Sequence, residues 1–297
     1  MNDAFNQILQ DRYSGSLTVA NRMLDFFQQV IANGEKHKTA LDELFEEVHQ
    51  ASKSLIKAQP NMVIIRRVWN QMQATFKRLL KSEAIPDDFY RILHDRVGEI
   101  RSELQENIAK IVHMGAKVIA ASNKVMTISA STLVREILLT THRQKRRFEV
   151  FVPKSDPPAE GIRFAEFLAA EGIRTTLIPD SQVGVFMADM NLVFTGADRI
   201  YERGFINKAG TLPVCLAAKH FNVPVYLVAE TMKILPESER TVKFHKENPD
   251  EVYKTKSENL HVENIYYERI PLDVAHKVIC EDGVFEVHEF FNWYLKE

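Results

Sequence analysis

Two short segments in the second half of the sequence carry residues suited to binding a phosphorylated sugar. Gly196–Asp198 follows the apolar run Leu192–Thr195, and Asn207 and Lys208 stand shortly before a helical pattern. Small residues let the backbone approach a ligand closely, and the Asp198 carboxylate can accept sugar hydroxyls or move a proton. Lys208 beside a helix amino terminus combines a positive charge with backbone N–H donors. Taken alone, Asp198 is explained as a turn cap and Lys208 as a solvated surface lysine. Taken together, the two segments predict a pocket for a small phosphorylated ligand.

A third segment, Thr127–Thr132, joins an apolar run to a helical pattern that begins near Leu133. Hydroxyl groups at a helix start cap free backbone N–H groups, and the same N–H groups can bind an anion. Simple capping by Ser131 is one interpretation. A position at the carboxyl end of a strand favours the other, in which Ser131 belongs to the phosphate site.

The sequence lacks the motifs of several other kinds of binding site. No two glycines are separated by a single residue, so the dinucleotide fingerprint is missing, as is the phosphate loop of nucleotide hydrolases. The ten histidines are scattered, so we expect no metal site. Since the nucleotide motifs are missing as well, we expect no cofactor. The basic run His142–Arg147 ends a predicted helix, where cations complement the helix dipole, and a nucleic-acid or partner surface is the alternative. Cys215, on the apolar face of a predicted helix, is expected in the core.

The elements that must position these residues fall into two groups. Apolar residues recur at intervals of three and four over 17–31, 41–55, 62–79 and 89–111, which predicts four amphipathic helices in an antiparallel bundle. After Gly115 short apolar runs alternate with helical patterns. The predicted strands are Lys117–Ala121, Val125–Ile128, Phe148–Val152, Arg174–Ile178, Asn191–Thr195 and Val223–Val228. The predicted helices lie at about 131–146, 158–171, 182–190 and 211–222.

This alternation is typical of an α/β fold with a largely parallel sheet and helices on both faces. Ligands of such sheets bind beyond the carboxyl ends of the strands. That rule selects the segments Thr127–Thr132, Asp180–Gln182 and Gly196–Thr211. The polar stretch 236–263 is expected to be a long surface excursion.

The bulk composition excludes several classes of protein. The 297-residue chain has a net charge of −2, so no global charge attracts it to nucleic acid or to an anionic membrane. Its first residues lack the pattern of a signal peptide, and no apolar run reaches the roughly 18–20 residues of a membrane-spanning helix. Cys215 and Cys280 are too few for a disulfide framework and suit a reduced cytoplasm. We therefore expect a cytoplasmic protein without a membrane partner, and nucleic acid is not the expected partner.

The segments around the predicted pocket resemble one known family. Gly196–Ile200, Gly204–Thr211 and Asn222–Tyr226 are similar to segments of the translation initiation factor 2B alpha/beta/delta-like family, which includes ribose-1,5-bisphosphate isomerase and 5-methylthioribose-1-phosphate isomerase. The resemblance is specific over 192–233. It implies an N-terminal helical domain, residues 1–115, and a C-terminal Rossmann-like domain, residues 116–297.

The resemblance also implies roles for particular residues. Gly15 and Ser16 look like the family's N-terminal turn that faces the substrate phosphate, and Gln59 begins a segment that looks like its Arg-Pro-Thr segment. Asp198 would be the general acid/base, and Asn207 and Lys208 match the isomerase pattern. Initiation-factor alpha subunits more often have glutamate at the position of Asp198.

Two departures from the isomerase pattern bear on function. The catalytic cysteine of the isomerases aligns with Ser129, whose hydroxyl is a far weaker acid and needs an activating base. The phosphate-clamping arginine aligns with Gln59, which has no charge and no guanidinium fork. Losing one charge-assisted contact of this kind costs on the order of 1.5–3 kcal/mol of binding free energy.

Two functions follow as expectations. The first is a non-catalytic, initiation-factor-2B-like protein that binds a sugar phosphate or nucleotide and forms a homodimer or a larger homo-oligomer, with a translation factor as a candidate partner. The second is an aldose–ketose isomerase in which Ser129 replaces the thiol. An unrelated enzyme and a nucleic-acid-binding module remain as further alternatives.

Overall fold

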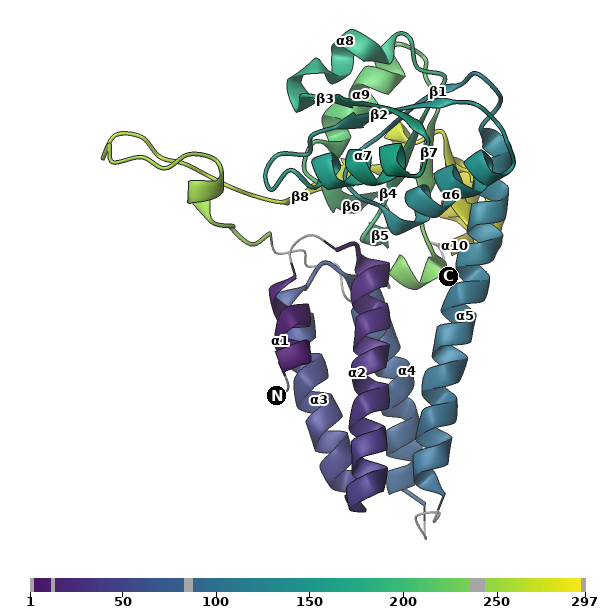
Figure 1. Cartoon of the computed structure of the whole chain (residues 1–297), viewed down its shortest axis with the longest axis vertical. Helices are drawn as coiled ribbons and strands as arrows, with labels where there is room; N and C mark the ends of the chain where they lie inside the picture. Colours follow the sequence, from purple (N-terminus) through teal and green to yellow (C-terminus); the bar gives the residue numbers. More distant parts are fainter. Residues whose placement is uncertain (1–2, 12–13, 83–87, 236–243, 295–297) are drawn as a thin grey trace. The chain divides into compact units, whose positions relative to one another are not determined.

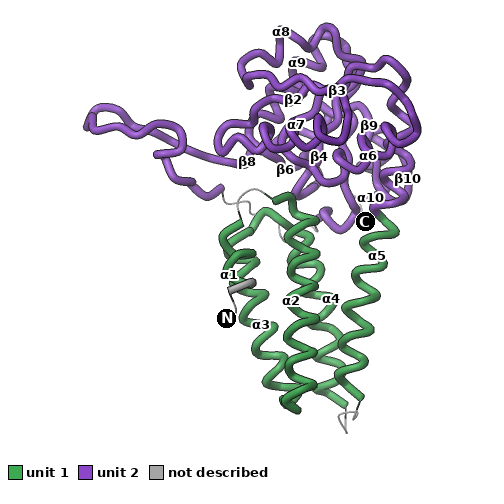
Figure 2. The backbone as a smooth tube through the Cα atoms, viewed as in Figure 1, with its two compact units in different colours: residues 1–107 green, residues 108–297 purple. Residues whose placement is uncertain are grey.

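A computed structural model describes residues 3–11, 14–82, 88–235 and 244–294 of the chain. The chain divides into two compact units, residues 1–107 and 108–297, which Figure 2 distinguishes by colour.

The first unit consists of helices (Figure 1). They are α1 (Asp3–Gln10), α2 (Ser16–His37), α3 (Leu41–Ala58), α4 (Val63–Leu80) and the first two thirds of α5 (Phe89–Val118). The four predicted helices are all present. The additional helix, α1, is only eight residues long, yet it buries Phe5, whose ring lies 4.7 Å from that of Phe26.

The helices of this unit pack through the apolar stripes that their spacing predicts. Phe27 and Phe76 are fully buried, and Trp69 is nearly so. The close packing of α2 on α3 depends on Gly34, because a Cβ atom at this position would lie 2.5 Å from the side chain of Leu44. On α5, Arg101 pairs with Asp25 of α2.

The segment Lys117–Ala121 is not a strand, and this prediction from its short apolar run is wrong. α5 continues to Val118 because Ile111, Ala116 and Ile119 keep facing the core, and because Gly115 leaves room for the Ile137 side chain. The guanidinium group of Arg146 then donates to the carbonyl oxygens of Ala116 and Ile119, at 2.6 and 2.7 Å. One residue of the basic run therefore caps the end of α5.

The second unit is built on a seven-stranded sheet in the order β10-β9-β7-β4-β1-β2-β3. The strands are β1 (Lys124–Thr127), β2 (Glu149–Pro153), β3 (Arg174–Ile178), β4 (Leu192–Gly196), β7 (Val225–Val228), β9 (Lys277–Cys280) and β10 (Gly283–Glu286). Neighbouring strands pair in parallel, except β10, which pairs antiparallel with β9.

The chain fills this sheet outward from β1, first through β2 and β3 on one side and then through β4, β7 and β9 on the other. This is the strand order of the doubly wound folds that bind ligands where the order reverses. The reversal lies between β1 and β4, so the loops after these two strands flank the expected ligand position. The helices of the unit are α6 (Thr132–Arg143), α7 (Glu160–Ala170), α8 (Val183–Met187), α9 (Thr211–His220) and α10 (Val287–Tyr294).

A second, three-stranded antiparallel sheet was not expected from the sequence. It contains β5 (Arg199–Tyr201), β6 (Gly204–Lys208) and β8 (Tyr267–Pro271). The segment expected to form a ligand loop after β4 is therefore mostly a hairpin. Gly204 permits it, since a Cβ atom there would lie 2.4 Å from the carbonyl oxygen of Ile270.

The expected surface excursion lies before β8. Residues 236–243 fall outside the described residues, and between 244 and 263 only the short 3-10 turn Pro249–Glu251 is regular. This segment extends from its own unit in Figure 1, and Tyr253 and Leu260 are exposed on it.

Candidate functional site

Three loops meet at the carboxyl ends of β1, β2 and β3 and are joined by hydrogen bonds. The Ser129 amide donates to the Ser155 hydroxyl at 3.0 Å. The amides of Ser155 and Asp156 donate to the two carboxylate oxygens of Asp180, at 2.8 and 3.0 Å. Ser129 has a φ of 62° and Ser155 a φ of 59°, a conformation that is uncommon outside glycine. These contacts hold the Ser129 backbone in place, and Asp180 acts by fixing loops.

The Ser129 side chain lies against a buried carboxylate. Its hydroxyl donates to Oε1 of Glu160 at 2.8 Å, and Glu160 Oε2 lies 3.4 Å from the ammonium nitrogen of Lys208. Glu160 is the first residue of α7, and Lys208 is the last residue of β6. The fold therefore joins segments that are far apart in the sequence into one cluster, defined here as the Ser129–Glu160–Lys208 cluster.

Both charged members of the cluster are buried, with relative exposures of 6% for Glu160 and 6% for Lys208. Burial raises the pKa of the Glu160 carboxyl, although Lys208 and the Ser129 hydroxyl act in the opposite direction. Burial likewise lowers the pKa of Lys208, against the attraction of Glu160. Desolvation thus outweighs pairing for both groups. A carboxyl whose pKa is raised in this way can exchange a proton closer to neutrality than an ordinary glutamate.

Lys208 has two further partners besides Glu160. Its ammonium group donates to the carbonyl oxygen of Pro157 and lies 4.3 Å from the ring centre of Tyr266. Lys208 is therefore not the solvated surface lysine that sequence reasoning had to consider. Its charge is held in a fixed, mostly desolvated position beyond the strand ends.

Asn207 faces the interior of the fold. Its amide nitrogen donates to the hydroxyls of Thr195, at 3.2 Å, and Thr211, at 2.9 Å. It links the end of β4 to the start of α9, and both hydrogens of its Nδ2 group are used in doing so. This geometry gives Asn207 a positioning role in the site.

The amino terminus of α9 already holds a carboxylate. Glu268, on β8, accepts a hydrogen bond from the Leu212 amide at 2.8 Å, and the amides of Gly210 and Thr211 also bond to it. These are the N–H groups that the sequence suggested for a phosphate. Glu268 therefore occupies these N–H groups, and Lys208 is the remaining candidate for phosphate binding in this segment.

The amino terminus of α6 differs from that of α9. Its first turn has no acidic residue, and Ser131 caps it by accepting a bond from the Val134 amide at 3.4 Å. Ser131 lies against Gly196 of β4, where a Cβ atom would be 2.8 Å from its hydroxyl oxygen. A helix amino terminus without an acidic residue in its first turn therefore lies at the point where the strand order reverses, a favourable location for an anion.

Asp198 lies two residues beyond Gly196, between β4 and β5, and is half-buried. Its amide donates to the Ile206 carbonyl oxygen at 2.9 Å, which closes the β5–β6 hairpin behind it. The backbone thus holds Asp198 just beyond the carboxyl end of β4, as Ser131 lies just beyond the carboxyl end of β1.

The three candidate residues of the first unit have local roles in the structure. Gly15 is the N-cap of α2, and Ser16 begins that helix and is buried. The Gln59 amide donates to the carbonyl oxygen of Asp11 at 2.8 Å, and Asp11 in turn accepts a bond from the Ser14 amide. Gln59 thus holds the turn that precedes α2.

Sequence reasoning missed Glu160, although the same rule that selected the other loops applies to it. Glu160 follows the loop after the third predicted strand, Phe148–Val152, and lies in the first turn of the predicted helix 158–171, which places it at the carboxyl edge of the sheet. Glu268 gave no comparable signal, because the second sheet that carries it was not expected.

Cys215 packs in the core, as predicted. It is fully buried, and burial raises its pKa to about 12. Among the described residues no group of histidine, cysteine and acidic side chains could hold a metal ion. No helix in the described ranges is both long enough and apolar enough to cross a membrane.

The helical unit and the doubly wound sheet define an α/β protein, and the buried Ser129–Glu160–Lys208 cluster lies beyond the carboxyl ends of the strands. The chain belongs to the Initiation factor 2 subunit family, whose model matches residues 12–287. The family resemblance seen in the sequence is therefore confirmed.

Relatives with two different descriptions are about equally similar to the chain. The putative translation initiation factor eIF-2B subunit 2-like protein of Pyrococcus horikoshii is 30% identical over 238 residues, 79% of each chain. The ribose 1,5-bisphosphate isomerase of Thermococcus kodakarensis is 28% identical over 278 residues, 88% of this chain and 86% of the relative. Among solved structures, translation initiation factor eIF-2B of Pyrococcus horikoshii OT3 matches with a TM-score of 0.76 at 22% identity, over 96% of both chains. This match confirms the predicted fold class.

Proposed function

We propose that this protein binds a small phosphorylated ligand, a sugar phosphate or a nucleotide, beyond the carboxyl ends of β1 and β4, and that it does so without catalysing a reaction. The observation that carries the proposal is the buried ammonium group of Lys208 within the Ser129–Glu160–Lys208 cluster. A desolvated, fixed ammonium group is a strong partner for a phosphate.

Glu160 provides a way for the site to accept an anion. Without a ligand, the carboxylate balances the charge of Lys208. Because burial raises the pKa of Glu160, an arriving phosphate can drive it to take up a proton. The charge of Lys208 then becomes available to the phosphate, and the protonated carboxyl can donate a hydrogen bond to it.

The case against catalysis rests on Ser129. Isomerisation of a sugar phosphate needs a group that can exchange a proton near neutral pH. A serine hydroxyl is a far weaker acid than a thiol and is a poor general acid. Gln59, engaged with the backbone of Asp11, offers no charge to a phosphate.

Thermal unfolding in the presence of ligands tests binding. The panel consists of ribose 1,5-bisphosphate, 5-methylthioribose 1-phosphate and AMP. A ligand at 100 times its dissociation constant adds about 2.7 kcal/mol to the free energy of unfolding, a rise of several degrees in melting temperature. We expect a rise with at least one ligand for the wild type and for Lys219→Ala, an exposed lysine on α9, but none for Lys208→Ala. Equal rises in all three proteins would refute a role for Lys208.

A second function, aldose–ketose isomerisation of a sugar 1-phosphate, is favoured by one specific contact. The hydrogen bond from Ser129 to Glu160 supplies the base that a serine needs for activation. In this alternative Glu160 and Asp198 would transfer the protons, and Lys208 would hold the phosphate.

Turnover separates the two functions. We expect no conversion of ribose 1,5-bisphosphate or 5-methylthioribose 1-phosphate by the wild type, whereas Ser129→Cys tests whether a thiol alone restores activity. Wild-type turnover at rates usual for enzymes, abolished by Asp198→Asn, would replace the binding proposal with the isomerase.

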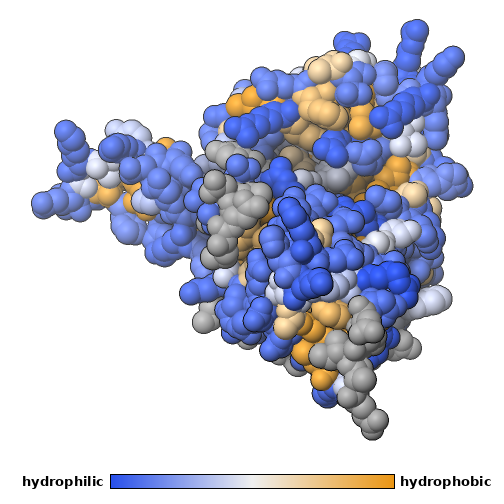
Figure 3. All heavy atoms as spheres, turned by 60° about the horizontal axis from the view of Figure 1, so that its bottom comes forward, coloured by the Kyte–Doolittle hydropathy of each residue, from blue (hydrophilic) through white to orange (hydrophobic). Residues whose placement is uncertain are grey.

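Assembly with further copies of the chain is part of the proposal. The face formed by α8 and α9 leaves Val185 72% exposed, Leu216 51% exposed and Phe221 41% exposed. Hydrophilic residues predominate on the face shown in Figure 3, with separate hydrophobic groups between them. Exposed apolar groups of this kind often mark interfaces between chains. Light scattering of wild type and Leu216→Glu measures the mass, and we expect an oligomer that the substitution weakens.

A further inference from the structure

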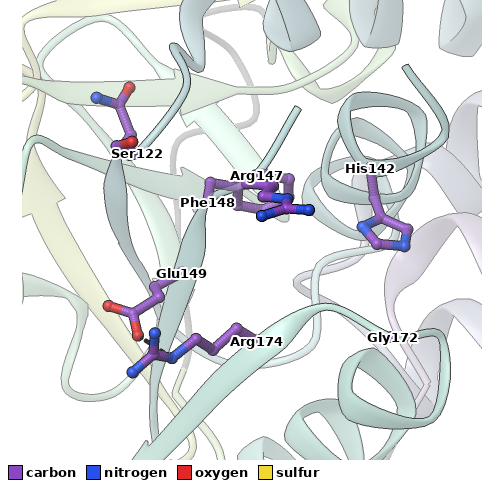
Figure 4. Close-up of a pocket in the computed structure, with 8 residues that line it drawn as sticks. Ser122, His142, Arg147, Phe148, Glu149, Gly172 and Arg174 are labelled. Carbon is purple, nitrogen blue, oxygen red and sulfur yellow. Dashed lines mark ion pairs between the residues drawn. The ribbon is translucent and has the colours of Figure 1, made fainter. Parts of the chain in front are cut away.

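A pocket lies at the edge of the sheet opposite the Ser129–Glu160–Lys208 cluster. It has a volume of about 490 Å³ and opens at the amino ends of β1, β2 and β3 (Figure 4). Asn123, Glu149 and Arg174 contribute from these strand starts, and His142 and Arg147 contribute from the end of α6 and the loop that follows it. This volume lies within the range of about 300–1,000 Å³ that is usual for small-molecule sites.

The charges around this pocket are mainly positive. Glu149 pairs with Arg174, as the dashed line in Figure 4 marks, and this pair leaves the guanidinium group of Arg147 unbalanced. In the view of Figure 4, the Arg147 and His142 side chains are drawn above and to the right of the Glu149–Arg174 pair. His142 is held beside the backbone of Gly172, where a Cβ atom would lie 3.5 Å from its Nε2 atom.

Three side chains of the pocket, Asn123, His142 and Arg147, keep hydrogen-bond donors that the described part of the chain does not use. The Oδ1 atom of Asn123 accepts a bond from the Ala120 amide at 2.7 Å, which leaves the Nδ2 group without an acceptor among the described residues. Over the same described ranges neither the His142 ring nor the Arg147 guanidinium has a hydrogen-bond or ion-pair partner. In contrast, the guanidinium group of the neighbouring Arg146 donates to the carbonyl oxygens at the end of α5. Arg146 and Arg147, although adjacent in the basic run, therefore differ in what they do.

We infer that this pocket binds a phosphorylated small molecule through Arg147, His142 and Asn123. The donor set consists of a guanidinium fork, an imidazole and an amide, and all of them suit the oxygens of a phosphate. The pocket is concave, which suits a small molecule better than the backbone of a long nucleic acid. This inference does not depend on the proposed function, because the two sites lie at opposite ends of the strands.

Titration calorimetry with inorganic pyrophosphate tests the inference on the full-length protein. The test variant is His142→Ala/Arg147→Ala. The control is Arg143→Ala/Lys145→Ala, which removes two basic residues from the same stretch of chain without touching the lining of the pocket. Lys208→Met is measured in parallel to remove binding at the other site. We expect pyrophosphate to bind the wild type, the control and Lys208→Met, and the test variant to lose at least tenfold in affinity for this site.

Each other outcome overturns the inference. Equal losses in the test variant and the control would mean that pyrophosphate responds only to net charge. Loss of all binding in Lys208→Met would place the ion at the other site. Binding of a single-stranded RNA through Arg147, with no binding of pyrophosphate, would replace the small molecule with a nucleic acid. Circular dichroism of every variant, including the buried Lys208→Met, verifies that each protein compared is folded at the temperature of the titration.

Discussion

Glu160 contacts Ser129 with one carboxylate oxygen and faces Lys208 with the other. The first contact is a hydrogen bond of 2.8 Å, and the second is an ion pair of 3.4 Å. Both charges are buried, so neither can be removed without leaving the other unbalanced in a site of low dielectric constant. The Glu160–Lys208 pair therefore links the stability of the second unit to the proposed ligand site.

A double-mutant cycle measures this coupling. Breaking a buried ion pair by removing one partner costs about 3–5 kcal/mol, so Glu160→Gln and Lys208→Met should each lower the free energy of unfolding substantially. The double variant should lose less than the sum of the two, because neither charge remains unpaired. Urea unfolding gives the three values, and strictly additive losses would contradict the pairing.

Ligand affinity should depend on pH through Glu160. Burial raises the pKa of this carboxyl above the ordinary value of 4.5, and only its protonated form leaves the Lys208 charge to a phosphate. Affinity should therefore fall as the pH rises through the raised pKa and Glu160 ionises. The phosphate of the ligand titrates as well, so affinity alone does not isolate Glu160. Calorimetry between about pH 5 and about pH 8 therefore measures the ratio of the wild-type affinity to the Glu160→Gln affinity. A ratio independent of pH would contradict the mechanism.

The two cysteines should be unreactive in the folded protein. Burial raises the pKa of Cys215 to about 12 and that of Cys280 to about 11, and the thiolate is the reactive form. A chromogenic disulfide reagent at pH about 8, near the ordinary thiol pKa, should therefore detect neither thiol before urea is added and both afterwards. Rapid labelling of either cysteine in the native protein would show that it is exposed.

Two helix glycines should respond to alanine in opposite directions. At Gly161 of α7 a Cβ atom would lie 2.1 Å from the carbonyl oxygen of Pro153, so Gly161→Ala should cost about 1–3 kcal/mol through overpacking. At Gly98 of α5 no atom lies within 4 Å, so Gly98→Ala should add about 0.5–1 kcal/mol through helix propensity. Urea unfolding compares them, and equal effects would contradict the close approach of α7 to β2.

The sequence predicted the elements whose residues keep a regular period. The helices of the first unit and five strands of the main sheet follow directly from apolar spacing, because each faces a single core. The error at Lys117–Ala121 arose since an apolar run at the end of a long helix looks like a short buried strand. The second sheet was missed because its strands are short and pair over long sequence separations.

The chemistry of the site was predictable in part. Lys208 was identified from its place before a helix, and the structure shows that its surroundings are set by Glu160, Pro157 and Tyr266, which lie up to 58 residues away in the chain. Contacts of this kind depend on tertiary packing, and local sequence patterns do not encode them. The use of the α9 amides by Glu268 is of the same kind.

Crystals grown with a ligand of the panel above test the central claim most directly, once calorimetry has established a saturating concentration. Bound phosphate should appear in the electron density within hydrogen-bonding distance of the Lys208 ammonium group, near Ser131 at the amino terminus of α6. Density for a saturating ligand at another place in the protein, with the Glu160–Lys208 pair unchanged, would contradict the account.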